Sequence, residues 1–370
     1  MSKRKAQDDD NLSGSETEDE STTTTMKKNK PLDQDEYDRQ NQSIIDLLSH
    51  TNITELKEED YQDWFNNIAY QLQNNVILYI NEIPHLMIEL EFYFKGYKHN
   101  DLFAHCDVMQ LEKASWYFHR TNGTFRGGSF KGLDITFGCG DDVYGGILIR
   151  SLKRVDSQST IVDGPSLCVD HILKLTKQAD IKTFVATAGR SVFESKNPLL
   201  YLKMLSDVDS SAQSSLPKPG RIEDMFGSGR VGLTFKRYKP TMEYFIAQNY
   251  RFLRYPDKVK KGKHYMVLSD GLQGKGPVEI KNRVGSTVAS IEKILKQITT
   301  GSKKTRANIK DYKTDLNNDA VCQLLALCAK LTKERLNGTE SSDANGDDGD
   351  DQDENDNQDD QDQTEDEDQE

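Results

Sequence analysis

The feature that most constrains the fold is the segment at residues 88–94, which reads IELEFYF. Apolar and polar side chains alternate strictly here, and this period of two indicates a β-strand with one buried face. The apolar side chains that the pattern turns toward a core are Ile88, Leu90, Phe92 and Phe94. The opposite side of the strand carries Glu89, Glu91 and Tyr93.

The polar side of this strand has two interpretations. Carboxylates in line with an aromatic ring suit a base-excising enzyme, because one carboxylate activates water while a ring holds a planar base. The same side also suits an ordinary solvated surface, which the heptapeptide taken alone favours, since alternation is the common signature of a half-buried strand. The heptapeptide leaves both interpretations open.

Charge is distributed unevenly along the 370 residues, whose net charge is −13. Residues 1–36 contain ten acidic and six basic side chains, and residues 340–370 contain 17 acidic side chains and no basic one. Residues 37–339 are left with a net charge of +8. We expect disordered tails over 1–36 and 339–370, because neither segment has enough apolar surface to fold. A basic body with an acidic tail suits a polyanion-binding protein, although such tails also serve solubility alone.

Cysteine and histidine spacing argue against a metal site or a cofactor. Five cysteines are scattered without a CxxC pair, which disfavours a disulfide framework and fits a reducing compartment. The histidines lack HExxH spacing, and the glycine-rich stretches at 127–132 and 227–232 match neither a P-loop nor a dinucleotide fingerprint. We therefore expect no metal and no cofactor.

Cellular placement is predicted from what the sequence lacks. No segment approaches the ~20 apolar residues of a membrane span, and the charged N-terminus has no secretory apolar core. An intracellular protein without a membrane partner is therefore expected. Basic clusters at 3–5 (KRK) and 27–30 (KKNK) permit import into the nucleus.

The periodicities predict one mixed α+β domain over residues 37–338. Helices are expected at 41–80, from Pro165 with Asp163 available as its cap, from Asn197–Pro198, and at 286–299 and 317–336. Strands are expected at 86–94, 133–137, 147–152, 231–236 and 250–255. No regular β–α alternation is present, which disfavours a doubly wound sheet. The Ser-, Pro- and Gly-rich stretch at 206–230 is interpreted as an excursion inside this domain.

Seven short motifs follow one another between residues 80 and 256. They are ELEFY (89–93), FAHC (103–106), RTNGTFRGGSFKGLDITFG (120–138), GGILIRSL (145–152), DGPSLC (163–168), GRVGL (229–233) and NYRFLR (249–254). In this order they resemble motifs of the alkyladenine (3-methylpurine) DNA glycosylases, of which the chain looks like a divergent member. The resemblance implies a single curved, mixed or antiparallel sheet domain, here extended by helices at 41–80 and 286–336.

The resemblance also implies a site and a reaction. Glu91 would be the general base, Arg150 would orient the water or the deoxyribose phosphate, and Tyr93 and His105 would sandwich the flipped base. Phe137 would be the wedge that fills the gap in the duplex. We expect contacts to the DNA backbone from Arg120, Arg126, Lys131, Lys260 and Lys261. Duplex DNA is the expected partner of a monomer, and hydrolysis without strand cleavage is the expected reaction, because no lysine is placed for a Schiff base.

Two alternatives to a DNA glycosylase stay open. A non-catalytic nucleic-acid or chromatin-binding module would keep the fold without the pocket. A hydrolase of a small N-glycoside would fit Asp134, which stands where the family has a second stacking tyrosine. A buried Arg150 also needs an acidic partner, and Glu91 would serve as one in a purely structural pair. Phe137, likewise, fits a core position as well as a wedge.

Overall fold

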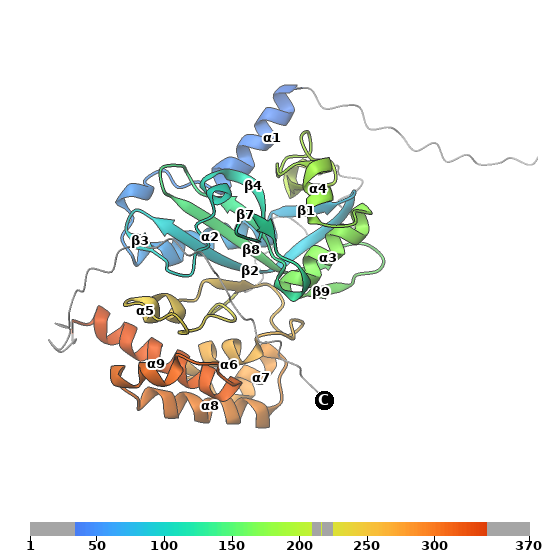
Figure 1. Cartoon of the computed structure of the whole chain (residues 1–370). Helices are drawn as coiled ribbons and strands as arrows, with labels where there is room; N and C mark the ends of the chain where they lie inside the picture. Colours follow the sequence, from blue (N-terminus) through green and yellow to red (C-terminus); the bar gives the residue numbers. More distant parts are fainter. Residues whose placement is uncertain (1–33, 209–215, 217–224, 339–370) are drawn as a thin grey trace, which may run out of the picture.

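A computed structural model describes residues 34–208, 216 and 225–338 (Figure 1). Both tails predicted to be disordered lie outside the described residues, except that the first helix, α1 (Gln34–Leu47), already begins at Gln34. Among the described residues, no helix has the length and the apolar character needed to cross a membrane.

A curled antiparallel sheet forms one layer of the molecule (Figure 1). Its strands run in the order β10 (Leu200–Met204), β1 (Val76–Ile80), β2 (Ile83–Gly96), β8 (Tyr144–Arg154), β7 (Leu133–Phe137) and β4 (Lys113–Phe118). Off this path, β12 (Arg251–Leu253) pairs with β2 and with β11 (Phe226–Ser228). The short strand β3 (His99–Asn100) pairs with the end of β2, and β9 (Ile161–Asp163) pairs with the end of β8. A separate hairpin joins β5 (Arg120–Thr121) and β6 (Thr124–Phe125). The prediction of a mixed α+β fold with an antiparallel sheet is confirmed.

Helices surround this sheet in two groups. The first contains α1, α2 (Asp60–Asn74), α3 (Pro165–Thr176) and α4 (Ile181–Ala188). The second forms a helical layer below the sheet in Figure 1 and consists of α5 (Met242–Ala247), α6 (Lys263–Leu272), α7 (Pro277–Val284), α8 (Val288–Ser302) and α9 (Asn318–Leu336). The amphipathic helices predicted near 286–299 and 317–336 are α8 and α9.

The central strand β2 contains a β-bulge that the alternating pattern did not reveal. Its pairing with β8 shifts register between Met87 and Leu90. Beyond the bulge, Leu90, Phe92 and Phe94 enter the larger core, whereas Ile88 enters a second core beside the helical layer. The prediction that Ile88 shares a face with Leu90 is therefore wrong, because a bulge puts two consecutive residues opposite one partner.

Four other sequence predictions are corrected. Residues 76–80 form strand β1 and not the end of a helix, because their β-branched and aromatic side chains pair with β2 and β10 on both sides. No helix starts at Asn197, whose side chain instead accepts the backbone N–H groups that open β10. Residues 231–236 form turns, not a strand. Asp163 does not cap α3, whose N-cap is Gly164.

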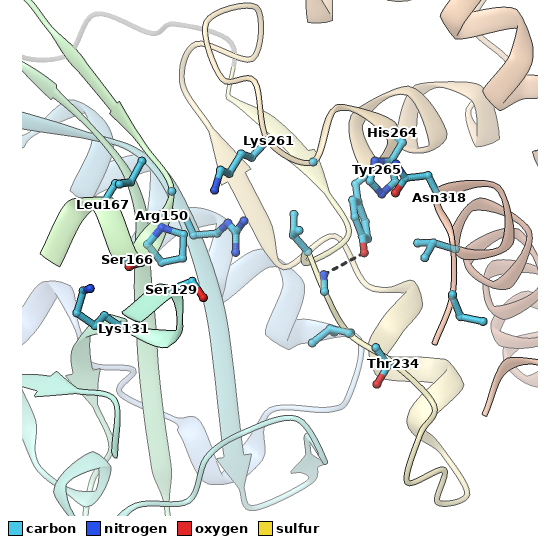
Figure 2. Close-up of a pocket in the computed structure, with 18 of the residues that line it drawn as sticks. Ser129, Lys131, Arg150, Ser166, Leu167, Thr234, Lys261, His264, Tyr265 and Asn318 are labelled. Carbon is cyan, nitrogen blue, oxygen red and sulfur yellow. Dashed lines mark hydrogen bonds between the residues drawn. The ribbon is translucent and has the colours of Figure 1, made fainter. Parts of the chain in front are cut away.

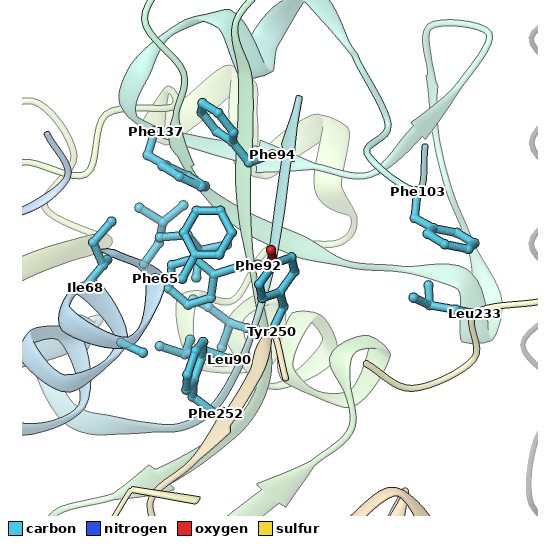
Figure 3. Close-up of a cluster of buried hydrophobic side chains, with 14 of the residues drawn as sticks. Phe65, Ile68, Leu90, Phe92, Phe94, Phe103, Phe137, Leu233, Tyr250 and Phe252 are labelled. Atoms are coloured by element: carbon cyan, nitrogen blue, oxygen red, sulfur yellow. The ribbon is translucent and has the colours of Figure 1, made fainter. Parts of the chain in front are cut away.

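The larger core lies between α2 and the concave sheet, and aromatic rings dominate it (Figure 3). Phe137 is 1% exposed there and stacks on Phe94 with ring centroids 5.5 Å apart. Edge contacts from Trp64 and Phe65 enclose the Phe137 ring further. A wedge must reach the surface to enter a duplex, so the DNA-wedge role predicted for Phe137 does not fit this structure.

Candidate functional site

The candidate site is built around Arg150, which β8 holds beside the polar side of β2. Its Nε lies 2.9 Å from Oε1 of Glu89 and 3.3 Å from Oε1 of Glu91. Strand β12 adds Arg251, whose Nε lies 2.7 Å from the same oxygen of Glu89. All four side chains are at least 97% buried. The polar side of β2 is therefore a buried ion-pair network, and the solvated interpretation of Glu89 and Glu91 is wrong.

The charges of this network compensate one another. Burial alone would raise the pKa of Glu89, but Arg251 and Arg150 lower it below the ordinary value of a carboxyl group. Burial alone would likewise lower the pKa of Arg150, but Glu91 and Glu89 raise it. Both groups are thus ionised in the folded protein.

Glu91 has hydrogen-bond donors on both of its oxygens. The backbone N–H of Val231 donates to Oε1 at 2.8 Å, and the Tyr93 hydroxyl donates to Oε2 at 2.9 Å. Burial and the neighbouring Glu91 raise the pKa of Tyr93 well above its usual value, so this hydroxyl keeps its proton. Tyr93 also receives the guanidinium of buried Arg230 over its ring, 4.5 Å from the centroid.

His105 lies apart from the ion-pair network. It lines a cavity of about 20 Å³ together with Tyr93, His119 and Asp134. His119 Nε2 is 2.8 Å from Asp134 Oδ1, and the His105 and His119 rings are 4.4 Å apart. A space of this size holds about one water molecule. The structure does place Tyr93 and His105 on one cavity, but it has no room for a base between them.

A much larger cavity, of about 360 Å³, lies where the sheet meets the helical layer (Figure 2). On the sheet side its walls are Arg150, the loop before β7 and the N-terminus of α3; on the other side they are the starts of α6 and α9. Tyr265 at the start of α6 accepts the backbone N–H of Gly232 at 3.0 Å, the dashed line in Figure 2. We call this space the interlayer pocket. Its size falls within the range of small-molecule and cofactor sites.

Of the five residues predicted to contact DNA, two line the interlayer pocket and three do not. Lys131 and Lys261 line the interlayer pocket. Lys131 pairs with Asp170 at 3.2 Å, whereas Lys261 has no described carboxylate partner. Arg126 lines the small cavity, and Arg120 is bound to Asp107 at 2.6 Å. Lys260 lies next to Lys261 but does not line the interlayer pocket.

Sequence reasoning missed several residues of this site. Arg251 and Arg230 were not singled out, because a charged side chain in a short strand or turn is ordinarily exposed. Asp101, which forms an ion pair with Arg230, was missed for the same reason. One signal in the sequence could have identified the two arginines: Arg230 and Arg251 each lie inside one of the seven motifs.

Metal ligation finds no support in the described part of the chain. No group of three or more His, Cys, Asp or Glu side chains there is placed to hold a metal ion. The Nε2 atoms of His85 and His171 lie 3.0 Å apart, and within the described ranges no third side chain of these types is placed to complete a metal site with them.

Comparison with known proteins gives one informative similarity. No family model and no solved structure matches the chain. An uncharacterized protein, L759, of Acanthamoeba polyphaga mimivirus is 31% identical over 225 residues, covering 56% of this chain and 95% of the viral protein. The chain therefore belongs to the same family as the mimivirus protein L759.

Proposed function

We propose that this protein binds duplex DNA and hydrolyses the N-glycosidic bond of a damaged or alkylated base, as a divergent relative of the alkyladenine DNA glycosylases. The observation that carries the proposal is Arg150, which connects the buried carboxylate Glu91 to the interlayer pocket. A guanidinium beside a carboxylate at the edge of a pocket is what activation of a water molecule near a phosphate requires.

In this proposal each residue keeps a defined task. Glu91 accepts a proton from water once the Tyr93 hydroxyl or the Val231 N–H gives up its hydrogen bond. Arg150 forms an ion pair with this carboxylate at 3.3 Å and faces the substrate from the interlayer pocket. Tyr93 and His105 hold the base only after the side chains around the small cavity separate, because that cavity has a volume of about 20 Å³. Basic side chains at the interlayer pocket attract the DNA backbone.

The proposal extends to partner and location. The residues 37–339 carry a net charge of +8, which favours a polyanion over a neutral nucleoside as ligand. The basic clusters at 3–5 and 27–30 support action in the nucleus, and the proposed active form is a monomer.

A second candidate is a nucleic-acid-binding module without catalysis. Glu91 favours it, because this side chain is 0% exposed and both of its oxygens already accept hydrogen bonds. A buried carboxylate whose two oxygens both keep these hydrogen bonds cannot accept a proton from a water molecule. The two candidates share the DNA-binding surface and differ only in the chemistry at Glu91.

A single-turnover assay separates the two candidates. The full chain is incubated with duplexes that carry one hypoxanthine, ethenoadenine, 3-methyladenine-type lesion or uracil, and abasic sites are cleaved with alkali. The glycosylase proposal predicts base release that Glu91→Gln abolishes and that Glu112→Gln, a change in an exposed ion pair, leaves intact. DNA binding without release from any duplex supports the non-catalytic module.

A further inference from the structure

The interlayer pocket contains a set of donors that no described side chain uses. Arg150 directs its guanidinium into the pocket in Figure 2. Its Nε lies close to both carboxylates, while its Nη1 is buried and has no hydrogen-bond partner among the described residues. The side chain is 3% exposed, so an unsatisfied donor here is costly unless a ligand or water completes it.

The N-terminus of α3 faces the same space. Gly164, Pro165, Ser166 and Leu167 all line the pocket, and the N-cap residue Gly164 has no side chain with which to cap this helix. The first turn of a helix presents N–H groups without intrahelical partners, and the helix dipole favours an anion at this end. In α3 these are the N–H groups of Ser166 and Leu167, since Pro165 has none and Cys168 already donates to Gly164.

Lys261 completes the arrangement from the opposite wall. A Cβ placed on Gly164 would lie 3.4 Å from its Nζ, so the ammonium group sits over the start of α3. The backbone N–H of Gly164 in turn donates to the Arg150 carbonyl at 2.8 Å, which fixes the helix start next to the arginine. Three kinds of donor thus converge: a guanidinium, an ammonium and free helical N–H groups.

We propose that this corner of the interlayer pocket, formed by Arg150 Nη1, Lys261 and the N-terminus of α3, binds a phosphate group. A tetrahedral anion with several acceptor oxygens satisfies donors that approach from different directions, and helix N-termini are common phosphate sites. The phosphate belongs either to a nucleic-acid backbone or to a free nucleotide. If the phosphate belongs to bound DNA, the inference rests on the proposed function; if it belongs to a free nucleotide, it does not.

The test compares two lysines of one basic turn in the full chain. Lys261→Met removes the pocket ammonium. Lys258→Met is the control, because Lys258 is exposed, pairs with Asp257 at 2.9 Å and does not line the pocket. Binding of inorganic phosphate and of deoxyadenosine 5′-monophosphate is measured by calorimetry, and binding of a duplex by fluorescence anisotropy. We expect Lys261→Met to weaken binding of phosphate, mononucleotide or duplex at least about fivefold, with less than about a twofold effect of Lys258→Met.

A second variant tests the helix without removing a lysine. Leu167 is 50% exposed, so Leu167→Asp is tolerated and places a carboxylate at the first turn of α3, where it competes with the phosphate. Leu167→Asn is its neutral control. We expect the aspartate variant, and not the asparagine variant, to weaken binding of the same ligands as Lys261→Met does.

The outcomes distinguish the phosphate site from the proposed function. An effect on the duplex alone assigns the phosphate to DNA, and an effect on the mononucleotide alone assigns it to a free nucleotide and counts against DNA as the ligand. If the duplex binds but both lysine variants behave alike and Leu167→Asp equals Leu167→Asn, the phosphate site is wrong while DNA binding stands. Absence of binding in all three arms overturns the phosphate site as well.

Discussion

At the scale of single residues, Glu89 holds the charge balance of the site. Its Oε1 lies within 2.9 Å of Nε of Arg150 and 2.7 Å of Nε of Arg251, and its Oε2 accepts from Ser151. The two guanidiniums are buried, so they depend on this carboxylate for compensation. The family resemblance implied no role for Glu89. The structure makes it central, because it stabilises the arginine that the proposed chemistry uses.

We predict that Glu89→Gln destabilises the folded protein by about 3–5 kcal/mol, because it leaves two buried guanidiniums with reduced compensation. The free energy of unfolding is measured by urea titration. Glu112→Gln is the control, since it removes one partner of the ion pair with Arg190, in which Glu112 is 52% exposed, and is expected to cost roughly 0–1 kcal/mol. Equal stability of both variants contradicts the assigned role of Glu89.

A second residue-scale prediction concerns His85. Burial lowers its pKa from 6.5 to about 4, with His171 and Arg154 lowering it further and Asp156 and the Ile83 carbonyl opposing them. The unfolded chain takes up this proton near pH 6.5 and the folded protein only near pH 4. The contribution of neutral His85 to the free energy of unfolding is therefore complete above pH 6.5. It is lost as the pH falls toward 4, by an amount on the order of 3 kcal/mol.

His85→Gln removes this dependence. We expect the plot of unfolding free energy against pH to become shallower between pH 4 and 6.5, by up to about 1.4 kcal/mol per pH unit. Other buried histidines, such as His99 with its pKa lowered to about 4, keep the rest of the slope. An unchanged slope for His85→Gln shows that His85 is not the buried neutral group described here.

At the scale of elements, strands β2, β7 and β8 and helices α3, α8 and α9 followed from the sequence. Period-two alternation, glycine boundaries, Pro165 in a first turn and amphipathic spacing are local signals, and they suffice for these elements. Strand β1 was missed because Ile77 falls near the helical spacing of Trp64, Ile68 and Leu72, so that residues 76–80 were interpreted as the end of the helix. The bulge in β2 was missed because it depends on pairing with β8, which no local pattern records.

The candidate site, like the fold, was predicted from the sequence only in part. Glu91, Tyr93 and Arg150 were predicted, and the structure brings them together because β2 and β8 are neighbours in the sheet. The distance of His105 from Arg150 and the burial of Phe137 depend on tertiary packing. The interlayer pocket was not predictable, because one side of it is formed by the starts of α6 and α9, which lie beyond the motifs.

The helical layer gives the element-scale prediction. In α8, a Cβ on Gly301 would lie 2.3 Å from the Gln323 carbonyl oxygen and 2.9 Å from the Ala326 Cβ, both on α9. We expect Gly301→Ala to destabilise the protein by about 1–3 kcal/mol, although helix propensity alone would favour alanine. Thermal or urea unfolding measures the change. Gly127→Ala, with open space around its Cβ, is the control, and stabilisation by Gly301→Ala contradicts the close α8–α9 contact.

At the scale of the whole molecule, a basic body and an acidic C-terminal segment carry opposite charge. Residues 37–339 have a net charge of +8, and residues 340–370 contain 17 acidic side chains. If the body binds a polyanion, the acidic segment competes with it, and salt screens the competition. Charge alone also permits a role in solubility, so the two roles need a direct comparison.

We predict that deleting residues 340–370 tightens binding to duplex DNA, and that the gain shrinks as salt rises from about 50 mM to about 200 mM. Fluorescence anisotropy of a labelled duplex measures both affinities. A chain in which the acidic side chains of this segment become Asn and Gln is the matched control and should behave like the deletion. Equal affinity of all three chains at low salt limits the acidic segment to solubility.

The central claim of the account is that DNA binds where the sheet layer meets the helical layer. Hydrogen–deuterium exchange of the full chain, with and without a lesion-containing duplex, tests it most directly. The account predicts slower exchange in peptides that contain the starts of α3, α6 and α9, which form the walls of the interlayer pocket. Protection confined to α1 and α4, with unchanged exchange around the pocket, would contradict it.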